Sequence, residues 1–538
     1  METKDNEQRP FSYHTFLLPF EIENENAEKL ESETIVREIL NSKVSYWKEI
    51  KENDRRDFVF NSVILTKNEE DKKKIIQAIA YNQKQYFHEN VMEAIHNESS
   101  NVVREFVFRF QGTDERTCIL KTLEEKKKRE EKTYTSKEYI LPVSNIRLKV
   151  FNTGICILIL EMYNKDYRNI ESVKEINALG RQVSLPFIAL DTTKEPCKLD
   201  STKILCAQEI TWTFLPNPND MEKTYSFEDK NDNFWEPDKP QEETYTMDLL
   251  SKLVIGKEKE PHYKLIPSID DRMFTCSLIQ DNDASEYFTR DYKVELEKVE
   301  LEKYNEVSKS LYEYIYIDKE GGCTAPTFSF RKEILEASLY HRWTESRTIY
   351  GASHTSFVGI VNEGDFAETI VTRPFLTQYV EIAILVLAQR ASILRFQKQI
   401  TSDLDNKKIK DLQKKYINYR NQLHFFELTS QEQGIELYEL IRKQLYIEKE
   451  MEKLEKNLVI VYEKSNIDSA NKYSLFGVII GAIAILSIVL DSTSFILNTK
   501  AETSFCLQFC LSIYKIFGIT LSTMFLWALL WRYINEKK

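Results

Sequence analysis

The chain has 538 residues, of which 42% are hydrophobic and 29% are charged, so it can form several domains or one large domain with insertions, and a large core. Its 73 Lys and Arg against 85 Asp and Glu give a net charge of −12, and the lysine-rich run at 126–129 is flanked by glutamates. This acidic balance argues against direct nucleic-acid binding, which needs clustered cations. The cysteines form no Cys-x-x-Cys pair and the histidines are dispersed, so we expect reduced cysteines, no metal site and no cofactor.

The N-terminal domain, 1–370, alternates between strand and helix patterns. Strands are predicted at 11–20, 58–65, 103–110 and 139–143, and a hairpin at 147–162 around the turn 152–154. Helices are predicted at 24–50, 70–97 and 169–182. This alternation predicts layered α/β or α+β architecture. The acidic segment 215–244, with four prolines, is typical of a mobile loop or a domain joint.

Motifs for catalysis are missing from this domain. It has no Walker-type phosphate loop, no His-Glu-x-x-His, no Gly-x-Gly-x-x-Gly and no Gly-x-Ser-x-Gly. We therefore expect a protein that is not an enzyme.

Candidate ligand-binding residues gather near position 350, where cations, aromatic rings and hydroxyls lie close in the chain. Such groups stack on bases and clamp phosphates. A triplet at 270–272 adds two aspartates that could hold a metal or a nucleotide ribose, or could form a local salt-bridge turn with their arginine. For the later segment, a strand–turn–strand with ordinary surface polar groups also stays open. The candidates are Arg272, Arg342, Trp343, Arg347, Tyr350, His354 and Ser356.

A helical stalk is predicted over 371–472. Helices are expected at 375–400 and 409–425, and the apolar run Ile382–Ala388 is short enough for a buried helix. A capping box, Thr429-Ser-Gln-Glu432, predicts a further helix from about 430, which as one helix to 496 would reach about 100 Å. A seam typical of coiled coils would pack on a helix of the same chain or of another subunit. The seam residues are Ile447, Met451, Leu454, Leu458 and Val461.

Two C-terminal segments, 473–497 and 505–533, are long and apolar enough to cross a membrane, which takes about 20 residues. They enclose an external loop, 498–504, and precede a short tail, 534–538; Lys515 would snorkel to the outer interface. Flanking lysines and arginines lie mostly on the side of the termini, and the polar segment 1–10 does not resemble a secretory signal. We expect a multi-pass protein of the inner (cell) membrane with both termini in the cytoplasm.

One helical face of the first span carries small and mildly polar residues at spacings of three and four. Two interpretations stay open and can hold together. The stripe can allow close helix packing, or it can line a pore in a symmetric oligomer, with a ring of aspartates that selects cations. The residues are Ser474, Gly477, Gly481, Ala484, Ser487 and Asp491.

This order of domain, stalk and two spans resembles the CorA family of divalent-cation channels, whose pentamers line their pore with the first transmembrane helix. The resemblance implies a CorA-like fold and a homo-oligomer, with a pentamer expected. The Gly-Met-Asn that ends the first span in CorA transporters does not occur here, since the corresponding stretch is Ser494-Phe-Ile-Leu-Asn-Thr-Lys500. The resemblance therefore implies an ion path without the magnesium filter of that family.

Five shorter segments resemble the CorA-like proteins associated with type III CRISPR loci. This resemblance implies a membrane effector in antiviral defence, activated by the nucleotide second messenger S-adenosylmethionine–AMP; it assigns no ligand residue. The alternatives are a constitutive divalent-cation transporter of the magnesium type and a membrane-tethered enzyme. The segments are Phe11-Ser-Tyr-His-Thr-Phe-Leu-Leu-Pro-Phe20, Phe151-Asn-Thr-Gly154, Asp270-Asp-Arg-Met-Phe274, Tyr350-Gly351 with Ser356, and Gln389-Arg-Ala-Ser392.

Overall fold

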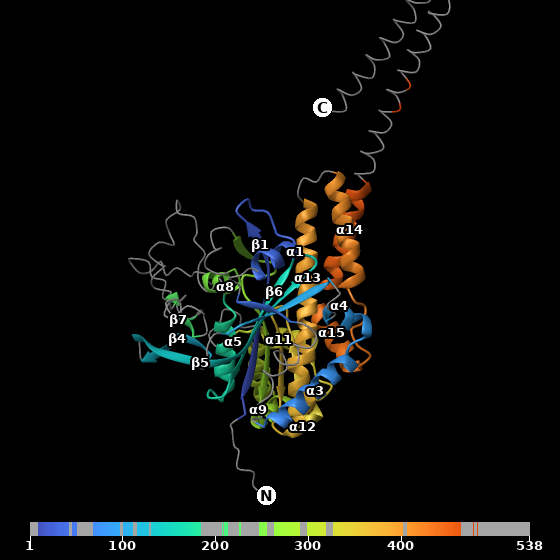
Figure 1. Cartoon of the computed structure of the whole chain (residues 1–538). Coiled ribbons are helices and arrows are strands. Elements are labelled where there is room, and N and C mark those ends of the chain that lie inside the picture. Colours follow the sequence, from blue (N-terminus) through green and yellow to red (C-terminus); the bar gives the residue numbers. More distant parts are fainter. Residues whose placement is uncertain are drawn as a thin grey trace, which may run out of the picture. The chain divides into compact units, whose positions relative to one another are not determined.

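Figure 1 shows the computed structural model of the chain. Its residues form two compact units. The main unit comprises Met1–Thr401 and Lys414–Leu454, and the second unit comprises Ser402–Gln413 and Glu455–Lys538. The structure describes residues 9–41, 46–50, 68–96, 101–110, 116–128, 131–183, 207, 209–213, 225–226, 247–255, 263–290, 298–318, 327–401, 406–463, 477 and 481.

The fold is mixed α/β, as predicted, and its described strands form one 13-stranded sheet. The path runs β11-β12-β13-β10-β1-β6-β5-β4-β7-β8, with β9 paired to β1, and β2 paired to β3, which pairs with β5. All pairs are antiparallel except β10 with β13. The strands are β1 Ser12–Asn24, β2 Trp47–Glu49, β3 Val103–Phe108, β4 Thr117–Lys128, β5 Glu131–Phe151, β6 Cys156–Asn164, β7 Glu209–Trp212, β8 Tyr225–Ser226, β9 Tyr263–Pro267, β10 Phe274–Gln280, β11 Leu339–Tyr340, β12 Thr348–Ala352 and β13 Ser356–Val361.

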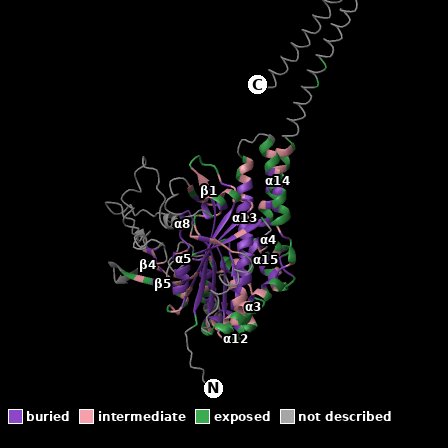
Figure 2. Ribbon diagram, viewed as in Figure 1, coloured by how far each residue is buried: buried purple, intermediate pink, exposed green. Residues whose placement is uncertain are grey.

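Helices lie on both faces of the sheet, and the alternation of side chains along β1 assigns the faces. His14, an even-numbered residue, hydrogen-bonds to Asn177 of α5 on one face. Glu21, an odd-numbered residue, points to the opposite face and lies 3.6 Å from Arg395 of α13. The sheet and α13 are largely buried (Figure 2). The helices are α1 Ser32–Thr34, η1 Ile35–Leu40, α3 Glu69–Tyr86, α4 Glu89–His96, α5 Ile170–Gly180, α8 Met247–Val254, α9 Asn282–Arg290, α10 Lys298–Tyr316, α11 Phe328–Ser338, η7 Thr344–Ser346, α12 Asp365–Ala367, η8 Glu368–Thr372, η9 Phe375–Tyr379, α13 Val380–Thr401, α14 Asn406–Gln422 and α15 Glu432–Gln444.

A buried hydrogen-bond chain ties β1 to the strand and the helix beside it. The Asn164 side chain donates to Ser12 at 3.0 Å, and Ser12 Oγ lies 2.9 Å from His14 Nε2. His14 Nδ1 lies 2.7 Å from the carbonyl oxygen of the Asn177 side chain, so Nδ1 carries the proton and Nε2 accepts from Ser12. Burial lowers the pKa of His14 to about 4, despite the bond to Asn177, so the ring is neutral at pH 7.

This neutral histidine predicts acid sensitivity. Because the pKa of His14 is lower in the folded than in the unfolded chain, its stabilisation is fully present above about pH 6.5. It is lost as the pH falls, by about 3 kcal/mol at pH 4. Urea unfolding of the wild type and His14→Gln between pH 7 and 4 tests this, and the variant should lose less stability on acidification. Equal losses would show that His14 does not limit acid stability.

The helices from α12 to α13 form one continuous helix, 365–401, widened by two π-helical stretches on either side of Pro374. Proline lacks an N–H and clashes with the carbonyl four residues earlier, and a wider turn relieves both problems. Among the described residues this is the one helix long and apolar enough to cross a membrane, with a mean hydropathy of 1.5 over a window that is 72% buried. The run Ile382–Ala388 is wholly buried, as predicted.

The predicted stalk is helical but interrupted. Helices at 375–400 and 409–425 are confirmed within a few residues by η9, α13 and α14. The expectation of one helix from 430 to 496 is wrong, because α15 ends at Gln444 and a second helix covers 447–463. At the break, Tyr446 has a φ of 54°, a left-handed conformation. The helix start predicted near 430 is confirmed by α15, which begins at Glu432. The capping box itself is wrong, since Thr429 Oγ accepts from the N–H of Gln431 at 3.1 Å and α15 has no side-chain cap.

The seam of the second helix packs within the same chain in its first part. Ile447, Met451 and Leu454 are buried, and the Tyr416 hydroxyl of α14 lies 3.8 Å from Met451 Sδ. Leu458 and Val461 are half-buried. Of the two predicted spans, the structure describes only Gly477 and Gly481, both helical and exposed; Ser474, Ala484, Ser487 and Asp491 lie outside the described residues.

In the N-terminal half, the predictions at 11–20, 103–110, 139–143, 147–162 and 169–182 are confirmed by β1, β3, β5, β6 and α5. The turn at 152–154 ends in Gly154, with a φ of 80°. Of the helix predicted at 24–50, the part at 32–40 is confirmed by α1 and η1. Its two ends are wrong, because β1 extends to Asn24 and β2 pairs with β3. The strand at 58–65 lies outside the described residues, and of 215–244 only β8 is described.

Candidate functional site

The seven candidate ligand residues do not form one cluster. Arg342, Trp343 and Arg347 precede β12, whereas His354 follows it in the turn to β13. The five residues of β12 between the two groups cover about 16 Å at the rise of a strand. The candidates therefore lie in two groups at opposite ends of β12, with Tyr350 between them.

The group before β12 is engaged by carboxylates. Arg342 donates to Glu436 at 2.6 Å and to Glu432 at 2.5 Å, both on α15, and these bonds raise its pKa. The Arg342 guanidinium also lies 5.8 Å from the Trp343 ring centroid, and Arg347 Nη2 lies 3.4 Å from Glu286. This group joins the edge of the sheet to α15.

Two candidates are structural in this arrangement. The Tyr350 ring is 4% exposed and stacks on Phe357 and Phe375 at centroid distances of 6.1 and 6.3 Å. Ser356 is fully buried, and its hydroxyl donates to the carbonyl of Ile315 near the end of α10. In these positions neither side chain is available to a ligand from solvent.

The group after β12 lies where the parallel strands β10 and β13 begin. The N–H of Thr275 donates to the carbonyl of Thr355 at 3.0 Å, which fixes the His354 turn beside the start of β10. The N–H of Met273 donates to the carbonyl of Arg181 at 2.7 Å, which brings the end of α5 to the same edge. Arg181, Arg272 and His354 thus come together from three separate parts of the chain.

Arg272 forms the local salt-bridge turn that was one of the two predictions. Its Nη2 lies 2.8 Å from Asp270, and its Nε lies 3.6 Å from Asp271. The bond to Asp270 raises the pKa of Asp271. Burial acts to raise the pKa of Asp270, but the bond with Asp271 and the charge of Arg272 outweigh it and lower that pKa. One carboxylate of the pair is held in its charged form against the arginine.

Arg181 is the residue that the sequence did not indicate. It is 6% exposed, and its Nε and Nη1 have no hydrogen-bond partner among the described residues. Burial and the nearby charge of Arg272 lower its pKa to about 10, with partial compensation by Asp270, Asp271 and Asp318. The surface of His354 is exposed, but partial burial of its ring and the charges of Arg272 and Arg181 lower its pKa. Arg181 lies at the end of the helix predicted at 169–182, and the sequence around it did not indicate these neighbours.

Segments that carry the CRISPR resemblance meet in space. Thr153 of the turn 151–154 hydrogen-bonds to Ser392 of α13 at 2.8 Å, and the carbonyl of Gly154 accepts from Arg395 at 3.0 Å. On the neighbouring strands, Leu17 of β1 is paired with Phe274 at the start of β10. These segments form the centre of the sheet and its contact with α13.

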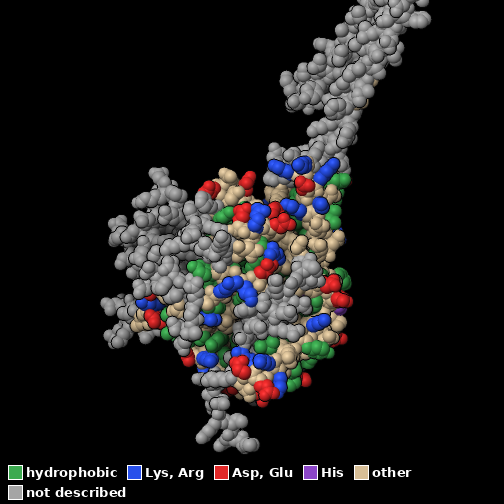
Figure 3. All heavy atoms as spheres, in the orientation of Figure 1, with side chains coloured by type: hydrophobic (Ala, Val, Ile, Leu, Met, Phe, Trp, Pro, Cys, Tyr) green, Lys and Arg blue, Asp and Glu red, His purple; other side chains and the backbone are tan. Residues whose placement is uncertain are grey.

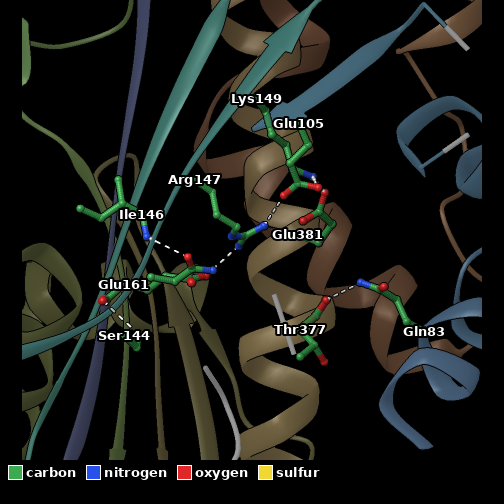
Figure 4. A network of polar contacts seen from close by, with 10 residues as sticks. Gln83, Glu105, Ser144, Ile146, Arg147, Lys149, Glu161, Thr377 and Glu381 are labelled. Atoms are coloured by element: carbon green, nitrogen blue, oxygen red, sulfur yellow. Dashed lines mark hydrogen bonds and ion pairs between the residues drawn. The ribbon is translucent and has the colours of Figure 1, made fainter. Parts of the chain in front are cut away.

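A buried ionic network fastens α13 to the sheet (Figure 4). Arg147 of β5 donates to Glu105 at 2.6 Å and to Glu161 at 2.7 Å. Lys149, two residues further along β5, is paired with Glu381 of α13, and both side chains are at most 4% exposed. Burial acts to lower the pKa of Arg147, but the three glutamates outweigh it and raise that pKa.

The other side of α13 bonds to the helices that follow it in the chain. Gln389 donates to the carbonyl of Leu423 at 3.0 Å and to the Tyr438 hydroxyl of α15 at 3.1 Å. Gln397 donates to Glu450 of the helix 447–463 at 2.9 Å. The helix α13 therefore links the sheet to the helices that lead toward the C-terminus.

Acidic and basic side chains are intermixed over the described part of the face in Figure 3. No group of three or more His, Cys, Asp or Glu among the described residues could hold a metal ion. No protein-family model matches the chain, no curated protein matches it, and no solved structure matches it.

Proposed function

We propose that this chain is a CorA-like membrane effector of type III CRISPR antiviral defence. Binding of S-adenosylmethionine–AMP to the main unit opens a path across the inner membrane through the segments 473–497 and 505–533. The protein acts as a homo-oligomer, a pentamer by its resemblance, with both termini in the cytoplasm. It works by ligand-controlled conformational change and has no catalytic step.

The observation that carries this proposal is the double attachment of α13. Its buried polar side chains bond to the sheet through Lys149 and Thr153, and to the following helices through Leu423, Tyr438 and Glu450. A helix bonded on both sides cannot shift against the sheet without moving the helices beyond it. The last of those helices, 447–463, leads along the chain to the first apolar segment.

Gating by a ligand requires that the ligand binds one state more tightly than the other. A difference of 1–3 kcal/mol, typical of coupled sites, changes the ratio of the two states by roughly 5- to 150-fold. The small-residue stripe of the first segment would then line the path, with Asp491 as a ring of carboxylates.

Calorimetric titration of the detergent-purified full chain with S-adenosylmethionine–AMP tests the proposal. We expect saturable heat with one ligand per chain, and much weaker binding of AMP or S-adenosylmethionine alone. No heat with tens of micromolar messenger would contradict the proposal. Rescue of a magnesium-auxotrophic strain without any messenger would instead favour the constitutive divalent-cation transporter.

A further inference from the structure

We propose that Arg181, with Arg272 and His354 beside it, forms a binding site for an anionic ligand group such as a phosphate or carboxylate. The site lies at the edge of the sheet where β10 and β13 begin, next to the ends of α5 and α10. The nature of the whole ligand rests on the proposed function, whereas the anion site rests on the geometry described here.

The first argument is the unsatisfied hydrogen bonding of Arg181. Its side chain is 94% buried by accessible surface, since 6% remains exposed, yet Nε and Nη1 have no acceptor among the described residues. Buried donors of a cation that lack acceptors cost free energy, because they have given up hydrogen bonds to water without replacement. An arginine presents its donors as a planar fork that matches two oxygens of a phosphate or carboxylate.

The second argument is that the neighbours of Arg181 leave it only partly compensated. Asp270 is already paired with Arg272 at 2.8 Å, so its one negative charge is shared between Arg272 and Arg181. Asp271 and Asp318 act on Arg181 at longer range, and none of the three carboxylates is hydrogen-bonded to it. An incoming anion would supply the missing acceptor without displacing a resident one.

The third argument is access from solvent. His354 is exposed, and the side chains of Arg272 and Asp271 are 38% and 57% exposed. These residues, on the turns 268–273 and 353–355, are electrostatic neighbours of the buried guanidinium. A ligand can therefore lie against His354 and Arg272 at the surface while one of its anionic groups reaches Arg181.

The site is also placed to act on the rest of the fold. The hydroxyls of Ser353 and Ser356, on either side of the His354 turn, hydrogen-bond to the carbonyl of Ile315 near the end of α10. On the other side of the turn, β13 carries Phe357, which stacks on Phe375 of the long helix 365–401 at 5.3 Å between ring centroids. A ligand that shifts this turn would act directly on the helix that links the sheet to the following helices.

The test uses the full chain in detergent and inorganic pyrophosphate as the probe, with sodium chloride at the same ionic strength as reference. We expect pyrophosphate at about ten times its Kd to raise the melting temperature of the wild type by about 2 °C. Arg181→Met should abolish that shift and should be at least as stable as the wild type without ligand. Arg168→Met, which removes an arginine paired with Glu363 at 2.9 Å, should keep the shift and serves as the matched control.

A wild type that pyrophosphate does not stabilise, or an Arg181→Met variant stabilised equally, would overturn the site. Should Arg181→Met fold poorly, Arg181→Lys can replace it, because lysine keeps the charge and loses the planar set of donors. The increase in melting temperature with pyrophosphate should then be at least threefold smaller than in the wild type.

A second experiment measures binding of S-adenosylmethionine–AMP to the same variants. Stabilisation by pyrophosphate without binding of the messenger would support the site and reject the messenger. If pyrophosphate does not stabilise the wild type and the messenger binds Arg181→Met and wild type equally, the site is rejected and the proposed function stands.

Discussion

Replacing Glu381 with glutamine is expected to lower the free energy of unfolding of the main unit by about 3–5 kcal/mol. The variant leaves the ammonium group of Lys149 buried without its carboxylate, and Lys149 is 1% exposed. Its next carboxylate is that of Glu105 at 4.0 Å, which already accepts from Arg147 at 2.6 Å. Removing the nearest carboxylate from a buried charge is costly, because the lost interaction is not replaced by water.

The control for this prediction is the double variant Lys149→Met with Glu381→Leu. Replacing both members of a buried pair with apolar residues of similar size is often neutral, so it should recover most of the lost stability. Denaturant unfolding of the wild type, Lys149→Met, Glu381→Leu and the double variant forms a thermodynamic cycle. A loss below about 1 kcal/mol in Glu381→Gln would show that the pair does not fasten α13 to the sheet.

Replacing Glu450 with alanine is expected to separate ligand binding from membrane permeation. Gln397 of α13 donates to Glu450 at 2.9 Å, and Arg390 lies 3.8 Å from it. The bond to Gln397 lowers the pKa of Glu450, so the carboxylate is charged at neutral pH. Loss of this link should leave the affinity for the messenger within about twofold and reduce messenger-dependent flux at least tenfold, equivalent to about 1.4 kcal/mol of coupling.

Glu439→Ala provides the matched control, because Glu439 is an exposed glutamate on the neighbouring helix α15. Its flux and its affinity should both match the wild type. Calorimetry and ion flux from liposomes measure the two quantities on the same preparations. If Glu450→Ala and wild type show equal flux, the contact between Gln397 and Glu450 does not couple messenger binding to ion flux.

The strands and helices that could be predicted from sequence are those whose local pattern agrees with their packing. The strand β1, the hairpin β5–β6 and the helix α5 are of this kind. The helix predicted at 70–97 is divided into α3 and α4, because Phe87 forms a β-bridge with Thr429 and the N–H of His88 donates to Leu428 at 2.9 Å. The break at Tyr446, between α15 and the helix 447–463, likewise could not be predicted, because no glycine or proline lies near it in the sequence. Contacts this distant in the chain leave no local signal.

The candidate site was predictable only in part, for a geometric reason. Residues 342–356 are close in sequence, but β12 runs through the middle of the segment and carries its two polar ends apart. Arg272 and His354 meet because β10 and β13 are parallel and begin at the same edge. Arg181 joins them through a backbone hydrogen bond to Met273, 92 positions away in sequence, and no property of its own segment indicates that contact.

Ion flux from liposomes that contain the purified full chain tests the central claim most directly. With an ion indicator inside the liposomes, we expect rapid flux when S-adenosylmethionine–AMP is added, and none with AMP or S-adenosylmethionine alone. Flux that is already maximal without the messenger, or a protein that binds the messenger and passes no ions, would contradict the account.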